Sequence, residues 1–293
     1  METIKTILII TSILYGSCAE HNSNYESSKR TDDISQSQIL ERKNHMNKTS
    51  IEYAIKFNIN LNKIIAGEKT KLLFSPRIKG DESNIIKLET FHEKEAHIII
   101  VTDDLEYFSH LHPVNEGNSN YSVEINLPFG GKYEMFIEYK PMGSDKIIER
   151  FDLNVEGREK SKAVFKNENH LFKDQSVSVI LQNAENLYSG KEIHLPVVIL
   201  KDGKELNAAK FDNYLGEKAH AVLIGIANFD FQHVHPMVMN NQLNLHMNID
   251  KIGYYRLWLQ FQIDGKLYTT DFVLEVKPSG HLMGQSNHNQ HKH

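Results

Sequence analysis

Residues 96–113 read AHIIIVTDDLEYFSHLHP, and residues 219–236 read AHAVLIGIANFDFQHVHP. The two stretches align without a gap at a separation of 123 residues. Each begins with Ala-His and a short apolar run, and each ends in Phe-x-His-x-His-Pro. A short apolar run bounded by turn-forming residues predicts a buried strand. Each stretch is therefore expected to form a strand, a turn and a return strand.

The similarity extends on both sides of these stretches. Gly67 matches Gly190 at the same separation, and Phe151 matches Phe272 after the loss of two residues. One domain is therefore present twice, as an internal repeat of about 123 residues. The predicted organisation is a β-sandwich repeat at residues 51–157, a polar linker at 158–171 and a second β-sandwich repeat at 172–277.

Both copies consist of short runs rich in β-branched and aromatic residues, which are typical of strands. Asp202-Gly203 and Asp264-Gly265 are dipeptides that favour tight hairpin turns. Neither copy shows a helical pattern. The predicted fold class is all-β, with two tandem immunoglobulin-like β-sandwich domains. A cupredoxin-like Greek-key barrel in each copy is the alternative.

Composition excludes several classes of function. The chain has 293 residues and a formal net charge of −5, whereas a protein that binds mainly nucleic acid needs a basic surface. A single cysteine excludes a disulfide framework and any cysteine-rich metal site. No nucleic-acid partner is therefore expected.

The N-terminus predicts export. Residues 1–18 combine Lys5, a short apolar run and small residues, as a secretory signal does. Their end resembles a bacterial lipoprotein signal, in which Cys18 would be lipidated and would anchor the chain to a membrane. That pattern usually has Leu where this chain has Tyr15. Cleavage near Ala19 without a lipid is the alternative. Polar residues 19–50 predict a flexible tether.

Histidines carry the main functional signal. Residues i and i+2 of a strand share a face at about 6.6 Å, so His110 and His112 can point toward one site. His97, thirteen residues upstream, would approach that pair across the hairpin. All-imidazole ligands suit copper or zinc. We expect one three-histidine metal site per domain; the alternative is a structural network of imidazoles bonded to loop carbonyls. The expected ligands are His97, His110 and His112 in the first domain, and His220, His233 and His235 in the second.

Further ligands are conceivable near the second site and at the C-terminus. Met237 and Met239 follow the second motif and offer soft thioethers for Cu(I). Residues 278–293 predict a disordered, histidine-rich tail of the kind that binds copper or zinc loosely. Its histidines are His281, His288, His291 and His293.

These motifs resemble a group of exported bacterial proteins and lipoproteins with tandem immunoglobulin-like domains. The shared pattern is Ala-His, an apolar strand, Asp-Leu, then Phe-x-His-x-His-Pro, and such proteins are often grouped with heavy-metal or copper-handling proteins. The second copy has Ala227-Asn228 where the pattern has Asp-Leu, which puts any role of Asp104 in doubt. The resemblance implies metal association.

The sequence thus predicts an exported metal-binding protein of the bacterial cell envelope, in the periplasm or on the outer membrane. Copper or a similar ion would be stored, delivered or detoxified, with a protein partner for metal transfer. The alternative is a lipid-tethered binding or adhesion module with structural histidines. An enzyme is not expected, because neither motif carries a shared nucleophile or general base, and Gly-x-Ser-x-Gly and His-Glu-x-x-His are missing from the sequence.

Overall fold

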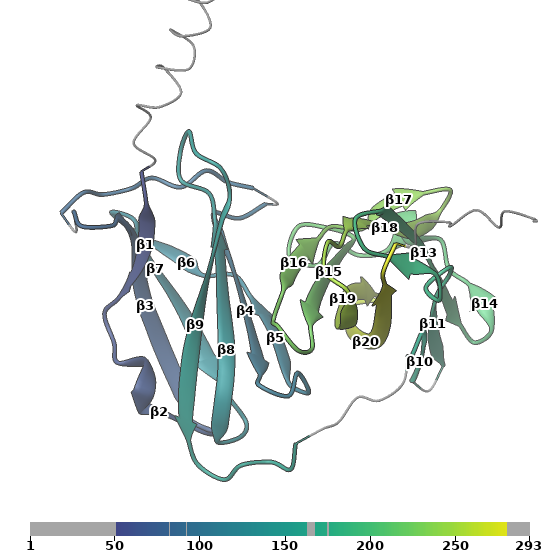
Figure 1. Cartoon of the computed structure of the whole chain (residues 1–293), viewed down its shortest axis with the longest axis horizontal. Coiled ribbons are helices and arrows are strands. Elements are labelled where there is room, and N and C mark those ends of the chain that lie inside the picture. Colours follow the sequence, from purple (N-terminus) through teal and green to yellow (C-terminus); the bar gives the residue numbers. More distant parts are fainter. Residues whose placement is uncertain (1–50, 82, 92, 163–167, 175, 280–293) are drawn as a thin grey trace, which may run out of the picture. The chain divides into compact units, whose positions relative to one another are not determined.

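The computed structural model describes residues 51–81, 83–91, 93–162, 168–174 and 176–279. From Glu52 onward the chain forms one compact unit. Over the described residues it is built from strands, with helical structure confined to single 3-10 turns at Leu61–Lys63 and Ala208–Lys210 (Figure 1). This confirms the all-β class. Among those residues, no helix has the length and apolar character needed to cross a membrane.

The first repeat contains two sheets. One has the strand order β1-β3-β7-β6, and the other has the order β2-β9-β8-β4-β5. The strands are β1 (Tyr53–Phe57), β2 (Ile64–Ile65), β3 (Lys69–Ile78), β4 (Ala96–Thr102), β5 (Phe108–Leu111), β6 (Val114–Gly117), β7 (Asn120–Asn126), β8 (Gly131–Tyr139) and β9 (Ile147–Glu156).

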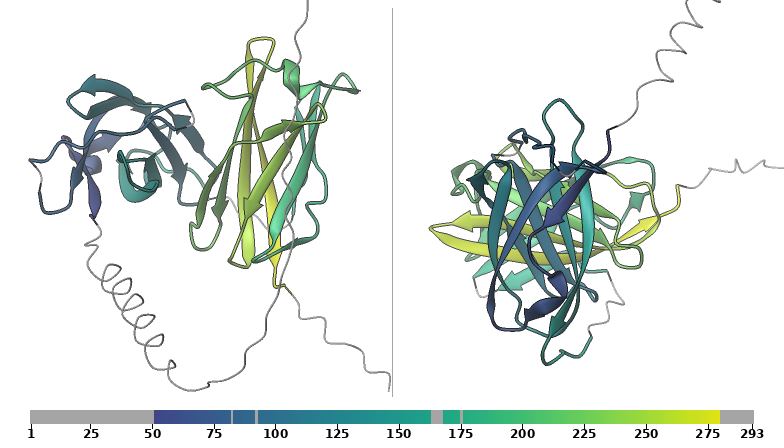
Figure 2. Two further views of the ribbon diagram at one scale, coloured as in Figure 1. Left: turned by 90° about the horizontal axis from the view of Figure 1, so that it is seen from above. Right: turned by 90° about the vertical axis from the view of Figure 1, so that its left-hand side faces the viewer.

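The second repeat has the same plan, with the orders β10-β11-β13-β18-β17 and β12-β20-β19-β15-β16, and β14 paired to β13. Figure 2 shows the strands of both repeats from two further directions. The strands are β10 (Leu171–Asp174), β11 (Val177–Leu181), β12 (Leu187–Tyr188), β13 (Glu192–Lys201), β14 (Lys204–Glu205), β15 (Ala219–Gly225), β16 (Phe231–Val234), β17 (Met237–Met239), β18 (Gln242–Asn248), β19 (Gly253–Ile263) and β20 (Lys266–Lys277).

Two open sheets per repeat make each repeat a sandwich rather than a closed barrel. In each repeat a two-residue strand, β2 or β12, pairs in parallel with the last strand, β9 or β20, while the long strands pair antiparallel. In the first repeat a four-stranded sheet faces a sheet built around the central and late strands, which is the arrangement of immunoglobulin-like domains; the second repeat enlarges the first of these sheets to six strands. The immunoglobulin-like expectation is thus confirmed.

The two predicted hairpins form as expected. Asp202-Gly203 connects β13 to β14, and Asp264-Gly265 connects β19 to β20. All four residues have positive φ angles, between 50° and 76°. Two consecutive positive φ angles define the type I′ turn, which Asp-Gly adopts at low steric cost.

Each sandwich has its own apolar core between its sheets. Ile98 and Ile100 of β4 point into the first core, and Ala221 and Leu223 of β15 point into the second. Because side chains alternate along a strand, Ile99 and Val101 of β4 and Val222 and Ile224 of β15 face outward. They are buried as well, in a third cluster to which both repeats contribute. Its members are Ile99, Val101, Leu105, Phe136, Val222, Ile224 and Trp258.

We call the third cluster the inter-repeat core. In it, equivalent residues of the two repeats make reciprocal contacts. Phe108 stacks on Trp258 with ring centroids 4.8 Å apart, and Phe136 stacks on Phe231 at 4.5 Å. Phe108 is the counterpart of Phe231, and Phe136 is the counterpart of Trp258. Reciprocal contacts of this kind are typical of an interface with two-fold symmetry, which here forms within one chain.

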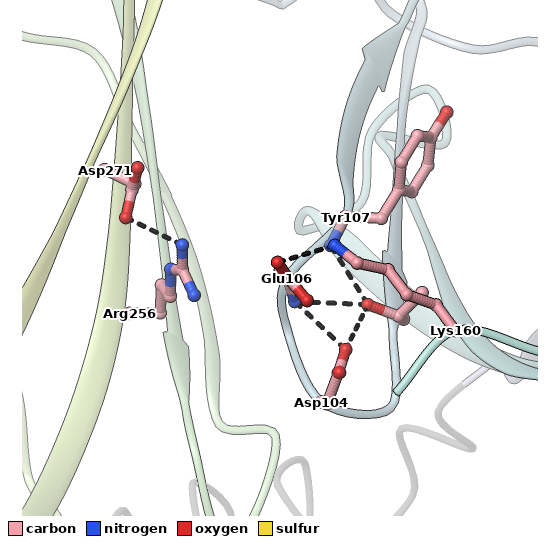
Figure 3. A network of polar contacts seen from close by, with 7 residues as sticks. Asp104, Glu106, Tyr107, Lys160, Arg256 and Asp271 are labelled. Carbon is pink, nitrogen blue, oxygen red and sulfur yellow. Dashed lines mark hydrogen bonds and ion pairs between the residues drawn. The ribbon is translucent and has the colours of Figure 1, made fainter. Parts of the chain in front are cut away.

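The Asp-Leu part of the motif shapes the turn between β4 and β5. Asp104 Oδ1 accepts hydrogen bonds from Thr102 Oγ1 at 2.6 Å and from the Glu106 backbone N at 3.2 Å, and Glu106 pairs with Lys160 at 2.6 Å (Figure 3). This turn holds Leu105 at φ 59°, fully buried in the inter-repeat core. The aspartate therefore has a structural role.

The second copy builds the same turn with different residues. Asn228 Oδ1 accepts from the Asp230 backbone N at 3.0 Å, and Phe229 adopts φ 54° and packs against the inter-repeat core. Ala227-Asn228 thus replaces Asp-Leu without loss of the turn. A positive φ on a non-glycine side chain carries strain, which the buried contacts of Leu105 and Phe229 offset.

We predict that Trp258→Ala lowers the free energy of unfolding by about 3–5 kcal/mol, because it leaves a cavity beside Phe108 in the inter-repeat core. Urea denaturation followed by circular dichroism measures the loss. The control is Tyr254→Ala on the same strand, which is 41% exposed and should change stability by no more than about 0.5 kcal/mol. Equal effects of the two substitutions would contradict a shared core.

Candidate metal centre

The strand and turn geometry brings the histidines of each repeat together. His97 is the second residue of β4, His110 lies in β5, and His112 follows β5 directly. The pairing of Ile98 with Leu111 continues to His97 and His112, whose ring centroids are 4.5 Å apart. In the second repeat, the rings of His220 and His235 are 4.9 Å apart in the same arrangement.

The two trios also meet one another. The ring of His97 lies 4.9 Å from that of His233, and the ring of His110 lies 4.9 Å from that of His220. His110 and His233, which are equivalent residues, are 5.0 Å apart. The trio predicted for the first domain does come together, with one ring nitrogen each of His97, His110 and His112 within 4.8 Å. A second such group combines His110 with His220 and His233 of the other repeat, so the two trios form one continuous cluster. We call it the six-histidine cluster: His97, His110, His112, His220, His233 and His235.

Four of these imidazoles are buried. His97 and His220 are at most 1% exposed, and His110 and His233 are 5% and 8% exposed. His112 and His235 are partly buried. A buried polar ring costs free energy unless its nitrogens find partners, so the partners of each ring decide what the cluster can do.

Backbone carbonyls fix the first ring of each repeat. His97 Nε2 lies 3.3 Å from the Phe91 carbonyl oxygen, and His220 Nε2 lies 2.9 Å from that of Tyr214. A carbonyl only accepts, so Nε2 carries the proton in both rings. Nδ1 is then the lone-pair nitrogen of His97 and of His220. Phe91 and Tyr214 are equivalent positions in the two repeats.

Side-chain oxygens of the opposite repeat fix the second pair of rings. His110 Nδ1 donates to Gln260 Oε1 at 3.3 Å, and His233 Nδ1 donates to Glu138 Oε2 at 2.7 Å. Glu138, at 1% exposure, is also paired with Lys146 at 2.6 Å. Gln260 and Glu138 are equivalent positions. The reciprocal contacts between the repeats therefore extend from the inter-repeat core into the cluster.

These bonds direct lone pairs toward one another. His97 Nδ1 and His110 Nε2 are 3.4 Å apart, and the outer hydrogen bonds leave both without a proton. His220 Nδ1 lies 3.1 Å from His235 Nε2. Both ring nitrogens of His112 are buried and have no hydrogen-bond partner. The cluster thus presents buried acceptors to one another.

The spacing fits a transition-metal ion. Two nitrogens at about 2.0–2.1 Å from a tetrahedral ion are about 3.3–3.4 Å apart, which matches His97 and His110. Metal-ligating histidines almost always donate the other ring N–H to a carbonyl or carboxylate, as His97, His110, His220 and His233 do. Two groups offer three ring nitrogens within 4.8 Å: His97, His110 and His112, and His110, His220 and His233.

Electrostatics keeps the rings neutral. Burial lowers the pKa of His110 well below its usual range, and the neighbouring histidines lower it further. Burial, together with His97 and His220, lowers the pKa of His112 to about 3. Neutral imidazole is the form that binds metal, so both rings are ready to do so at neutral pH.

The other predicted ligands lie elsewhere. Met237 and Met239 are on β17, in the other sheet of the second repeat, and about half of each side chain is exposed. The predicted signal, the tether and Cys18 lie outside the described residues. So do the four tail histidines, His281, His288, His291 and His293.

The sequence did not predict the residues that accept hydrogen bonds from the cluster histidines. Phe91 and Tyr214 accept through backbone carbonyls, which any residue carries, and their rings lie 5.0 Å and 6.0 Å from those of His97 and His220. Glu138 and Gln260 lie late in the repeats, in strands otherwise rich in apolar residues. The signal available for them was a polar side chain at the same position of two apolar strands.

Fold and cluster together define a protein with two immunoglobulin-like sandwiches that share a buried group of histidines. The family described as Domain of unknown function (DUF8832) matches residues 49–157 and 172–278, and the chain belongs to this family. None of the curated proteins matches the chain significantly.

Solved structures resemble the chain at low identity. An endo-β-1,4-mannanase from Thermotoga petrophila is 13% identical over 45% of this chain and 25% of its own, with a TM-score of 0.26. The N-terminal Ig1-2 module of the Drosophila receptor protein tyrosine phosphatase DLAR is 8% identical over 77% and 98%, with a TM-score of 0.21. A two-domain fibronectin type III segment of chicken tenascin is 8% identical over 76% and 98%, also at 0.21. The chain spans only a quarter of the mannanase.

We predict that acid destabilises the metal-free protein through the cluster. His112 titrates near pH 6.5 when unfolded and at about 3 when folded, so the unfolded chain binds more protons between these values. The free energy of unfolding therefore falls as the pH decreases through that window. Urea denaturation at pH 7.5 and pH 5 measures this fall, and His112→Gln should reduce it. An unchanged pH dependence in that variant would contradict a depressed pKa.

Proposed function

We propose that this chain binds a transition-metal ion, copper or zinc, in the six-histidine cluster. The observation that carries the proposal is the pair of lone-pair nitrogens, His97 Nδ1 and His110 Nε2, facing each other at 3.4 Å while oxygen acceptors hold their outer nitrogens. A cation bound between these two nitrogens would make a favourable contact with both lone pairs at this spacing.

The donor set supports the choice of ion. Imidazole ligands suit copper and zinc, whereas calcium and magnesium prefer oxygen. Glu138, a buried carboxylate, accepts a hydrogen bond from His233 on the side away from the cluster and supplies negative charge that favours a cation. No catalytic step is proposed, and the role is one of binding.

The arrangement suits storage or delivery. Both groups of three nitrogens include His110, and a single lone pair serves one ion at a time. The two groups therefore compete for one ion. The ion can move from one group to the other by exchanging two of its histidine ligands while His110 remains bound. Such stepwise exchange is what transfer to a partner requires. Together with the export signal and lipid anchor expected from residues 1–18, this supports an exported protein of the bacterial cell envelope that stores, delivers or detoxifies metal.

A structural role for the histidines is the competing proposal, and one contact favours it. His235 Nε2 lies 3.1 Å from His220 Nδ1, the distance of an ordinary imidazole hydrogen bond. In that case the cluster would only hold the two repeats together, as part of a tandem β-sandwich module that binds another protein. Metal titration separates the two proposals.

We predict that Zn²⁺ or Cu⁺ stabilises the full chain in solution. A ligand that binds only the folded state at 100 times its Kd contributes about 2.7 kcal/mol, and the thermal midpoint should rise accordingly. His97→Gln should abolish most of the rise. The control is His170→Gln, a histidine outside the cluster, which should preserve it. A rise of equal size in both variants would contradict binding at the cluster.

We predict that Glu138→Gln weakens metal binding about 10–100-fold. The amide still accepts from His233 Nδ1, as Gln260 does for His110, so the fold is preserved while the negative charge is lost. The converse change, Gln260→Glu, should strengthen binding. Competition with a chromophoric chelator measures both affinities. Equal affinity in the wild type and in Glu138→Gln would show that this carboxylate does not support an ion.

A further inference from the structure

A second group of histidines lies on the outer face of the second repeat. His194 of β13 and His246 of β18 are directly opposite each other in the antiparallel register. The side chains of their neighbours, Ile193 and Leu245, point into the sandwich core. Alternation therefore directs both imidazoles away from that core, and Glu192, two residues before His194, shares their face.

The three side chains are in ligand-like proximity. The His194 and His246 rings are 4.3 Å apart, with His194 Nδ1 at 3.4 Å from His246 Nε2. Glu192 Oε1 lies 3.3 Å from His194 Nε2. One donor atom from each of the three residues lies within 4.8 Å of the others. Unlike the six-histidine cluster, this group is open to water, because the His194 and Glu192 side chains are 51% and 73% exposed.

The first repeat shows what this position looks like without histidine. The equivalents of His194 and His246 are Lys71 and Glu124, which are opposite each other in the same register. Lys69, the equivalent of Glu192, forms an ion pair with Glu124 at 2.7 Å. An ordinary exposed ion pair thus satisfies this backbone geometry. Imidazoles are therefore not required for the fold at this position.

We infer that Glu192, His194 and His246 form a separate, solvent-facing site for a divalent transition-metal ion such as Zn²⁺, Cu²⁺ or Ni²⁺. Two imidazoles and a carboxylate are ligands that these ions accept, and water completes the coordination. An exposed site with water ligands exchanges its ion faster than a buried one. The inference does not depend on the six-histidine cluster, since no residue is shared.

Isothermal titration of the full chain with Zn²⁺ tests the inference. His194→Lys combined with His246→Glu places at these two positions the residues that the first repeat has there, Lys71 and Glu124. An unchanged metal-free thermal midpoint confirms that this variant folds. It should bind one zinc ion fewer than the wild type. Any zinc held by the C-terminal histidines is common to both proteins and cancels in the difference. The same number of ions with the same affinities would overturn the inference.

Two further variants complete the test. Glu138→Gln, which alters the six-histidine cluster, should leave this binding event in place, so failure of one site is distinguishable from failure of the other. Lys69→Glu, Lys71→His and Glu124→His together transplant the site to the first repeat. This triple variant should gain one zinc ion over the wild type. An unchanged number would overturn the assignment of binding to this cross-strand geometry.

Discussion

Burial of one outer sheet face of each repeat against the other is the constraint on which this structure depends. The strands β4 and β15 carry apolar side chains on both faces, and neither strand could remain exposed in water without cost. Each large apolar side chain that is removed from water contributes about 1.5–3 kcal/mol. The inter-repeat core, with its exchanged stacks of Phe108 on Trp258 and Phe136 on Phe231, therefore joins the two sandwiches.

The same burial removes the histidine rings of both repeats from water. His97 and His220 occupy the first outward-facing positions of β4 and β15, so closure of the inter-repeat core carries them out of water with their partners from β5 and β16. Oxygen acceptors satisfy one nitrogen of each buried ring, and the remaining nitrogens converge. A protein that needed only a stable interface would replace these rings by apolar side chains at lower cost. Their presence in both copies supports the proposal that the cluster binds an ion.

Sequence and structure agree on everything that depends on local pattern. The repeat, the strands, the two Asp-Gly hairpins and the approach of His97 to His112 all follow from short-range spacing. Packing between the copies could not be predicted in this way, because an internal alignment shows equivalence and not contact. One clue was present: Ile98 to Val101 is apolar without alternation, which is typical of strands covered on both faces. His194 and His246 were missed for a related reason, since they have no histidine counterparts in the first repeat and lie far apart in sequence.

Anomalous diffraction from crystals of the full chain grown with zinc or copper tests the central claim most directly. The account predicts a peak inside the six-histidine cluster, within bonding distance of His110 and of either His97 and His112 or His220 and His233. An empty cluster, with the histidines bonded only to one another and to their oxygen acceptors while the solution contains excess metal, would contradict it.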